Sequence, residues 1–309
     1  MRIVIFIFLC IVWGTTWVAI KVTLEGFPPF LGAAFRFAVA SLLLFSFLRL
    51  KNISMKIKRS DFFMISLSAF FLYALDYGLI YWGEQYLSAG VTAIFFATFP
   101  LFTGIWATFL FRNESFRWNK FVGLLLALAG VVVVFLDQLI LTQFDQMIIL
   151  GVAAIISGAA FAAIALVLVK KYLATVQPVA LSFHQMLQGV IFLLVFSLFL
   201  ENPTLVTLNM RVIIAVCYLG AVGSALAFAL YYFLLQQMSA ITLSLIIYIT
   251  PIIALIFDYL VFGEVIQIRA IIGMFIIFAG IAFVELDLKR LNTFHKRFKV
   301  HHNNKHLNS

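Results

Sequence analysis

Three ionisable residues lie inside long apolar stretches of the sequence: Arg36, Asp76 and His184. A charged side chain at the centre of a membrane helix costs at least about 2.5–3.5 kcal/mol, so such residues persist mainly where they are paired or hydrated. Arg36 and Asp76 could bind the two ends of a zwitterion, or could form an ion pair that only orients helices. His184 could be a pH-sensitive gate or a hydrogen-bonded structural residue.

Tryptophan and tyrosine side chains near these residues could form the walls of a binding site, by stacking or by cation–π contacts. Trp13, Trp17 and Tyr77 are expected on the same side of the membrane midplane as Arg36 and Asp76. Tyr81 and, from the second half of the chain, Tyr248 are further candidates. Most phenylalanines are expected to pack against lipid or other helices.

Two prolines interrupt apolar segments at matching places, Pro100 within residues 88–111 and Pro251 within residues 239–262. Proline removes a backbone donor and leaves a carbonyl free near the membrane midplane. Paired interruptions of this kind mark the binding region of a transporter, whereas a simple packing kink explains one proline more readily than two. The candidate substrate-binding residues are therefore Trp13, Trp17, Arg36, Asp76, Tyr77, Tyr81, Pro100, His184, Tyr248 and Pro251.

The composition requires that these residues sit in a membrane protein. The chain of 309 residues is 65% hydrophobic and 11% charged, with a mean hydropathy of +1.14. A helix needs about 20 apolar residues to cross a bilayer. The sequence predicts ten such helices, over residues 3–21, 29–48, 62–83, 88–111, 118–136, 148–169, 178–200, 210–235, 239–262 and 268–286.

The second half of the sequence repeats the first. Ser88-Ala89, Pro100, Glu114, Gly123, Ala129-Gly130 and Asp137 recur as Ser239-Ala240, Pro251, Glu264, Gly273, Ala279-Gly280 and Asp287. Each copy holds an odd number of membrane segments, so the copies must run antiparallel as an inverted repeat, an architecture of secondary transporters. We expect a first repeat over 1–137, an external linker over 138–147, a second repeat over 148–287 and a basic tail over 288–309.

Most of the 21 lysines and arginines fall on the side of the membrane that holds the N-terminus. The positive-inside rule therefore places both termini in the cytoplasm. The net charge of +9 is then a sign of topology and does not indicate a nucleic-acid partner. The basic tail is expected to be attracted to anionic membrane lipid.

The quoted motifs resemble a known family. The stretch Trp13-Gly14-Thr15-Thr16-Trp17 with Pro28-Pro29, Ala34-Phe35-Arg36-Phe37, Ser88-Ala89-Gly90, Pro100, Glu114, Gly123 and Ala129-Gly130 is similar to the EamA unit of the drug/metabolite transporter superfamily. Residues 148–287 resemble a second unit. The resemblance implies an all-α protein of ten transmembrane helices in two inverted five-helix repeats. It also implies export of amino acids or related metabolites across the bacterial inner membrane.

The same residues are also compatible with other substrates and with several ways of driving transport. An organic cation or drug held by Asp76 and Trp17 is the alternative substrate. Direct ATP drive is excluded because this chain has no phosphate-binding loop motif, which leaves facilitated transport, exchange or ion coupling, with Asp76 and Glu84 as candidates for proton coupling. A membrane-embedded enzyme is disfavoured, because four of the five histidines lie in residues 295–306 and no metal or acid–base cluster is evident. No cofactor is expected.

Overall fold

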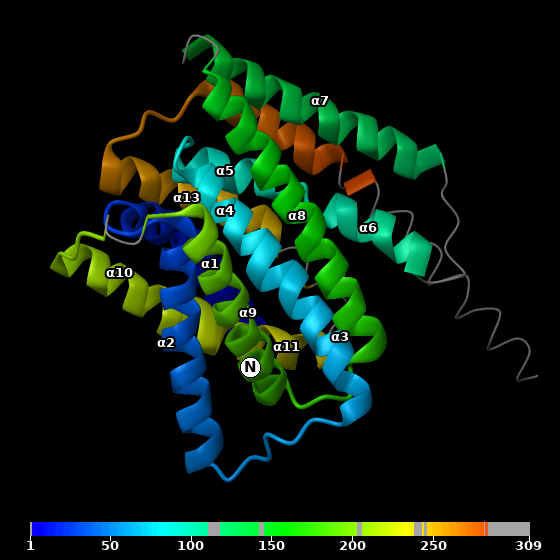
Figure 1. Cartoon of the computed structure of the whole chain (residues 1–309). Coiled ribbons are helices and arrows are strands. Elements are labelled where there is room, and N and C mark those ends of the chain that lie inside the picture. The colour runs from blue at the N-terminus through cyan, green and yellow to red at the C-terminus, as the bar shows by residue number, and fades with distance from the viewer. Residues whose placement is uncertain are drawn as a thin grey trace, which may run out of the picture.

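The computed structural model describes residues 2–110, 118–141, 145–202, 206–237, 243, 246–280 and 282–283, and within these residues every regular element is a helix (Figure 1). The first half contains α1 (Arg2–Leu24), α2 (Pro29–Leu50), α3 (Arg59–Ala69), η1 (Phe70–Asp76), α4 (Tyr77–Glu84), α5 (Ala89–Phe96), α6 (Phe99–Leu110) and α7 (Trp118–Leu141). The second half contains α8 (Gln146–Tyr172), α9 (Pro178–Leu200), α10 (Met210–Gly220), η3 (Ala221–Leu226), α11 (Ala227–Gln237), α13 (Ile246–Phe262) and a last helix, Ile268–Gly280.

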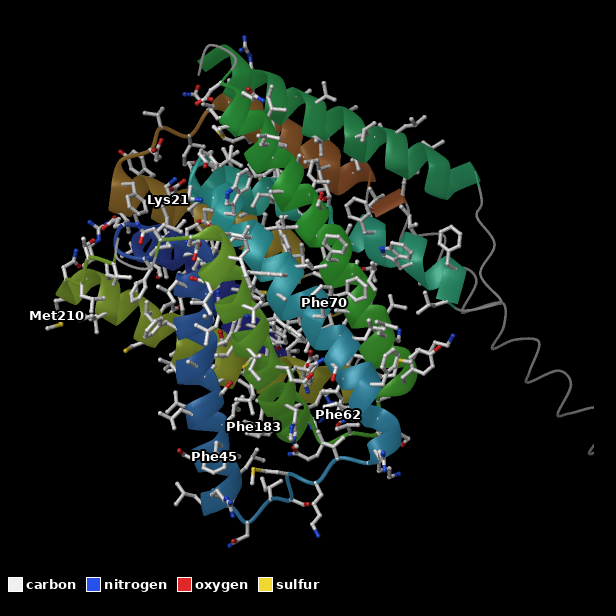
Figure 2. All side chains as sticks on the ribbon, in the orientation of Figure 1. Lys21, Phe45, Phe62, Phe70, Phe183 and Met210 are labelled. Atoms are coloured by element: carbon white, nitrogen blue, oxygen red, sulfur yellow. The ribbon has the colours of Figure 1, made fainter. Side chains whose placement is uncertain are left out.

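In the described part of the chain, seven helical spans are long and apolar enough to cross a membrane. Three of them are composite: α3, η1 and α4 form one span, α5 and most of α6 form another, and α10, η3 and α11 form the third. The shorter apolar helices in the described part are Leu125–Val134, Ile249–Phe262 and Ile268–Gly280. Large apolar side chains such as Phe45, Phe62 and Met210 project from the outside of the bundle, as expected for a surface that faces lipid (Figure 2).

The helices lie close to the segments expected from the sequence, with two differences. Residues 88–111 form two helices, α5 and α6, because the chain turns at Ala97 and Thr98. The connection between the halves is also shorter than 138–147, since α7 runs to Leu141 and α8 begins at Gln146. The carboxylate of Asp145 caps α8 by accepting a hydrogen bond from the backbone nitrogen of Met147 at 2.9 Å.

Each half has a π-helical turn in its third helical span. The turns begin at Phe70 and Ala221, which are separated by the same interval as Pro100 and Pro251. A π-turn is rare, and it often occurs at a functional site because it disturbs the regular hydrogen bonding of the helix. The repeat in the sequence is therefore matched by a repeated irregularity in the backbone.

The helices of the two halves interlock. α2 packs along α9, α1 packs against α13 and α10, and α8 packs against α6 and α4. Glycine allows the close approach of α1 to α13, because a Cβ added at Gly14 would lie only 2.5 Å from the Cβ of Ile253. The centre of the bundle is consequently built from both halves.

A second close contact joins α7 to the last helix, at one edge of the bundle (Figure 1). A Cβ at Gly130 would meet the carbonyl oxygen of Gly273 at 2.7 Å, and a Cβ at Gly280 would meet that of Gly123 at 2.6 Å. All four glycines belong to the repeated motif. Their repetition is thus explained by backbone-to-backbone packing between the two helices.

The start of α2 is held by the end of α9. The two carboxylate oxygens of Glu201 accept hydrogen bonds from the backbone nitrogens of Phe30 at 2.7 Å and Leu31 at 3.0 Å. These nitrogens belong to the first turn of the helix, where backbone N–H groups have no partner within the helix and the helix dipole favours negative charge. Glu201 therefore ties the two halves together near the membrane surface.

We expect Glu201→Ala to lower the free energy of unfolding by about 0.5–2 kcal/mol, the usual cost of removing an N-terminal cap. Thermal unfolding in detergent measures this change. Glu25→Ala is the control, because Glu25 pairs with Arg211 at 3.3 Å between side chains that are 36% and 52% exposed, and exposed ion pairs contribute little. Equal losses in the two variants would contradict the capping role.

Candidate functional site

A cavity of about 110 Å³ lies inside the bundle, between the two halves. Its walls come from α1, α2, η1, α4, α5, α6 and α8, and from α11, α13 and Leu243. Five of the ten candidate residues line it, namely Trp13, Trp17, Arg36, Asp76 and Tyr77. Residues far apart in the sequence thus meet at one place.

Arg36 is fully buried and is held by the π-turn of the opposite half. Its Nε donates a hydrogen bond to the Oγ of Ser224 at 2.7 Å, and its Nη2 donates to the carbonyl oxygen of Gly223 at 3.4 Å. The guanidinium carbon also lies 4.7 Å from the ring centre of Tyr77 and 5.3 Å from that of Phe37. Nη1 has no hydrogen-bond partner among the described residues, so one amino group can still donate to a ligand.

The π-turn η3 supplies an unusually accessible carbonyl. The oxygen of Gly223 accepts from the indole nitrogen of Trp13 at 3.3 Å as well as from Arg36. A Cβ at position 223 would lie 2.8 Å from the Cγ2 of Thr16, so glycine is needed for this approach. The carbonyl of Gly223 therefore orients two side chains that line the cavity, Arg36 and Trp13.

Asp76 is the last residue of η1 and is also buried. Its Oδ1 has no hydrogen-bond partner in the described part of the chain. Across from it lies the small-residue stretch of α8, where a Cβ at Gly158 would be 3.1 Å from that oxygen. The absence of a side chain at Gly158 leaves room for the carboxylate.

Arg36 and Asp76 line the same cavity without a direct contact. Within the described ranges they form no ion pair shorter than 4.0 Å. Each keeps one buried polar atom without a hydrogen-bond partner in the described residues. Because buried polar atoms are nearly always hydrogen-bonded in native proteins, these two atoms are candidates for contact with a polar ligand.

Aromatic rings make up much of the remaining wall. Trp13 lies 5.0 Å from Tyr231 and 5.5 Å from Phe228, measured between ring centres, and Trp17 lies 5.2 Å from Phe96. These separations are typical of favourable aromatic pairs, which hold one another in fixed orientations. The walls of the cavity are accordingly rigid and apolar.

The two prolines do not line the cavity, but their neighbours do. Pro100 is the second residue of α6, just after the chain turn, whereas Pro251 lies inside the continuous helix α13. The hydroxyl of Thr250 donates to the carbonyl oxygen of Ile247 at 3.2 Å, and this is the carbonyl that the proline cannot pair with. Thr250 and Ile247 both line the cavity, so the proline shapes its wall indirectly.

The remaining candidates lie elsewhere. Tyr81 does not line the cavity but is buried close to the guanidinium of Arg36, and the side chain of Tyr248 is outside the described part of the structure. His184 also lies outside the cavity, where its Nε2 is 2.9 Å from the carbonyl oxygen of Met55 in the connection between α2 and α3. This hydrogen bond joins α9 to the connection between α2 and α3.

Gln185 lies seven residues after Pro178 at the start of α9, as Arg36 lies seven residues after Pro29 at the start of α2, and it makes the corresponding contact from the second half to the first. Its Nε2 donates to the Oγ of Ser68 in α3 at 2.7 Å, and its Oε1 accepts from the hydroxyl of Tyr232 at 2.9 Å. Arg36 and Gln185 therefore both reach from the second helix of one half into the third span of the other.

Comparison with known proteins agrees with this architecture. The sequence profile of the EamA-like transporter family matches residues 1–136 and again residues 149–286. The chain belongs to the EamA-like transporter family. The two matched regions correspond to the two halves described above.

Similar proteins include Protein PagO of Salmonella typhimurium, 28% identical over 281 residues that make up 90% of each chain. The uncharacterized transporter YoaV of Bacillus subtilis is 26% identical, with 88% of this chain and 92% of YoaV covered. A solved structure titled "Crystal structure of protein" superposes with a TM-score of 0.68 at 18% identity, covering 92% of this chain and 97% of the other. That last likeness shows the fold alone.

Sequence reasoning about this EamA-like transporter misses Gly223 and Ser224, which hold Arg36, and the wall residue Phe228. All three belong to a half that lacks the obvious charges, and no periodicity in the sequence predicts a π-turn. A Gly-Ser pair inside an apolar span was the available signal, since small and hydroxyl-bearing residues often satisfy a polar group from a neighbouring helix.

We expect Ser224→Ala to lower the free energy of unfolding by about 1.5–3 kcal/mol, because a hydrogen bond to a charged group is lost and the Arg36 Nε remains buried. Thermal unfolding of the purified protein measures the loss. Ser182→Ala is the matched control, since Ser182 is equally buried but its Oγ has no partner among the described residues. An unchanged stability of Ser224→Ala would show that Ser224 does not hold Arg36.

Proposed function

We propose that this EamA-like transporter is a secondary exporter of neutral amino acids or closely related zwitterionic metabolites. The observation that carries the proposal is the pair of unsatisfied, oppositely charged groups, Arg36 and Asp76, in one cavity. A substrate carboxylate would accept from Arg36 Nη1, and a substrate ammonium group would donate to Asp76 Oδ1. Charge-assisted hydrogen bonds of this kind are about twice as strong as neutral ones.

The rest of the wall favours an apolar substrate side chain of modest size. Ile20, Leu72, Ile80 and Phe99 line the cavity beside the aromatic rings. The volume of about 110 Å³ is well below the roughly 300–1,000 Å³ of pockets for drug-sized ligands. A small solute therefore fits this conformation better than a bulky drug.

The architecture we propose is ten transmembrane helices in two inverted five-helix repeats, with alternating access to the cavity between them. Support comes from the reciprocal packing of α1 with α13 and of α8 with α6, and from the matched π-turns. The distribution of basic residues supports cytoplasmic termini and a bacterial inner-membrane location. Inverted repeats with a site at their interface are typical of secondary transporters.

An organic cation is the second candidate substrate. The unpartnered Oδ1 of Asp76 and the rings of Trp13, Trp17 and Tyr231 would attract a cation. Arg36 weighs against it, because a second positive charge in the same small cavity repels a cationic ligand.

The proposal predicts that a neutral amino acid stabilises the wild-type protein against heat and that Arg36→Gln abolishes the effect. A ligand that binds only the folded state adds about 2.7 kcal/mol at 100 times its dissociation constant. A thermal-shift series in detergent with amino acids, nucleosides and organic cations makes the measurement.

His184→Gln serves as the control for that series, since His184 lies outside the cavity and the variant should keep the full stabilisation. Stabilisation by organic cations alone, lost in Asp76→Asn but retained in Arg36→Gln, would replace the amino acid assignment with the cation one.

A further inference from the structure

A second group of charged residues lies one helical turn beyond the cavity. Lys21 of α1 (Figure 2) follows the cavity residue Trp17 by one turn, and Glu84 of α4 follows the cavity residue Ile80 by one turn. Asp258 of α13 completes the group, and both carboxylates are buried. On the side of this group that faces away from the cavity, Lys21 and Asp258 line a second pocket of about 490 Å³, which we call the outer pocket. The group therefore separates the cavity from this pocket.

Lys21 and Asp258 hold the turn between α4 and α5. The Nζ of Lys21 donates to the carbonyl oxygens of Glu84, at 2.9 Å, and Leu87. The Oδ2 of Asp258 accepts from the backbone nitrogen of Gly90 in the first turn of α5, at 2.8 Å. The positive charge of Lys21 thus interacts favourably with the C-terminus of α4, and the negative charge of Asp258 with the N-terminus of α5, because the helix dipole is negative at the C-terminus and positive at the N-terminus.

Glu84 has no such partner. Both of its carboxylate oxygens are buried without a hydrogen bond in the described residues, and Glu84 is 0% exposed. An ionised carboxylate in this position would be strongly unfavourable, whereas a protonated one removes most of the desolvation penalty. The side chain is accordingly suited to carry a proton.

Charge balance supports the same conclusion. The buried path through the protein holds two cations, Arg36 and Lys21, and three carboxylates, Asp76, Glu84 and Asp258. With every group ionised, the negative charges exceed the positive ones by one. A single proton makes the set neutral, and among these three carboxylates Glu84 is the one with both oxygens buried and without a hydrogen bond in the described residues.

The other groups that face Glu84 do not change this balance. They are Lys21 of α1, Arg36 of α2, Asp258 of α13 and Tyr81 of α4 itself. α8 meets this end of α4 with Gly151 and Ile155, which do not titrate. A metal site is not indicated here, because the described residues contain no cluster of three or more metal-ligating side chains.

We propose that Glu84 binds the proton that couples export to a proton gradient. This inference rests on the proposed transport function. In the conformation described here Lys21 and Asp258 close the outer end of the cavity and Glu84 is protonated. Loss of the proton leaves a buried charge that is compensated either by water entering from the outer end or by movement of Lys21 toward Glu84. Proton release and opening of the outer end are thereby linked.

Proteoliposomes with radiolabelled L-leucine as the probe test the coupling. We expect wild-type protein to accumulate leucine against its gradient when a pH gradient is imposed. Glu84→Gln, which mimics the protonated acid, should abolish that accumulation and retain leucine exchange across the membrane. Arg36→Gln should abolish both.

Glu264→Gln is the matched control, because Glu264 lines the outer pocket but is exposed, and both activities should survive. Accumulation by Glu84→Gln at the wild-type level overturns the proposal. Failure of Glu84→Gln to fold while Glu84→Asp folds also overturns it, since a neutral isostere would then be unable to replace the side chain.

A measurement without substrate separates this proposal from the transport function itself. If Glu84 holds a proton in the folded protein and releases it in the unfolded chain, stability falls as the pH rises from about 5 to about 8. The melting temperature of Glu84→Gln should fall less over that range than that of the wild type. Identical pH profiles overturn the proposal, and absence of leucine transport by wild-type protein tells against the proposed function alone.

Discussion

The organisation of this protein depends on one constraint, which is that a guanidinium inside an apolar bundle must be solvated by protein. Arg36 meets the constraint by reaching into the opposite half, to the Oγ of Ser224 and the carbonyl of Gly223, while its planar face lies against Tyr77. Those partners exist only when the two halves interlock. Arg36, the candidate binding residue, therefore also joins the halves, because separating them would leave its buried positive charge without these hydrogen-bond partners.

The π-turns and the glycines are the means by which helices accommodate such groups. In the interior of a regular helix each carbonyl already accepts one backbone hydrogen bond, and the irregular geometry of η3 accompanies the two side-chain hydrogen bonds that the Gly223 carbonyl accepts. Gly158 likewise makes space beside Asp76. Backbone irregularity and missing side chains occur where polar groups need room, whereas the lipid-facing surface is regular and apolar.

The charged residues of the cavity differ from those beside the outer pocket in how their polar atoms are satisfied. Arg36 and Asp76 each leave a polar atom facing the cavity, which suits recognition of a substrate with two charged ends. Lys21 and Asp258 are hydrogen-bonded to helix ends, whereas the carboxylate of the nearby Glu84 has no hydrogen bond within the described residues. In our proposals, the first set binds the substrate and the second responds to a change in charge.

Sequence alone predicted the membrane class, the approximate helices and the EamA resemblance, because hydropathy and repeated motifs are local properties of the chain. It also singled out Arg36, Asp76, Trp13, Trp17 and Tyr77, since charge and aromaticity are conspicuous in apolar segments. Only the tertiary structure decided that Ser224 and Gly223 hold Arg36, that His184 bonds the connection at Met55, and that Arg36 and Asp76 stay apart. Those outcomes depend on which helices of opposite halves become neighbours, and a linear pattern carries no information about the orientation of a side chain across such an interface.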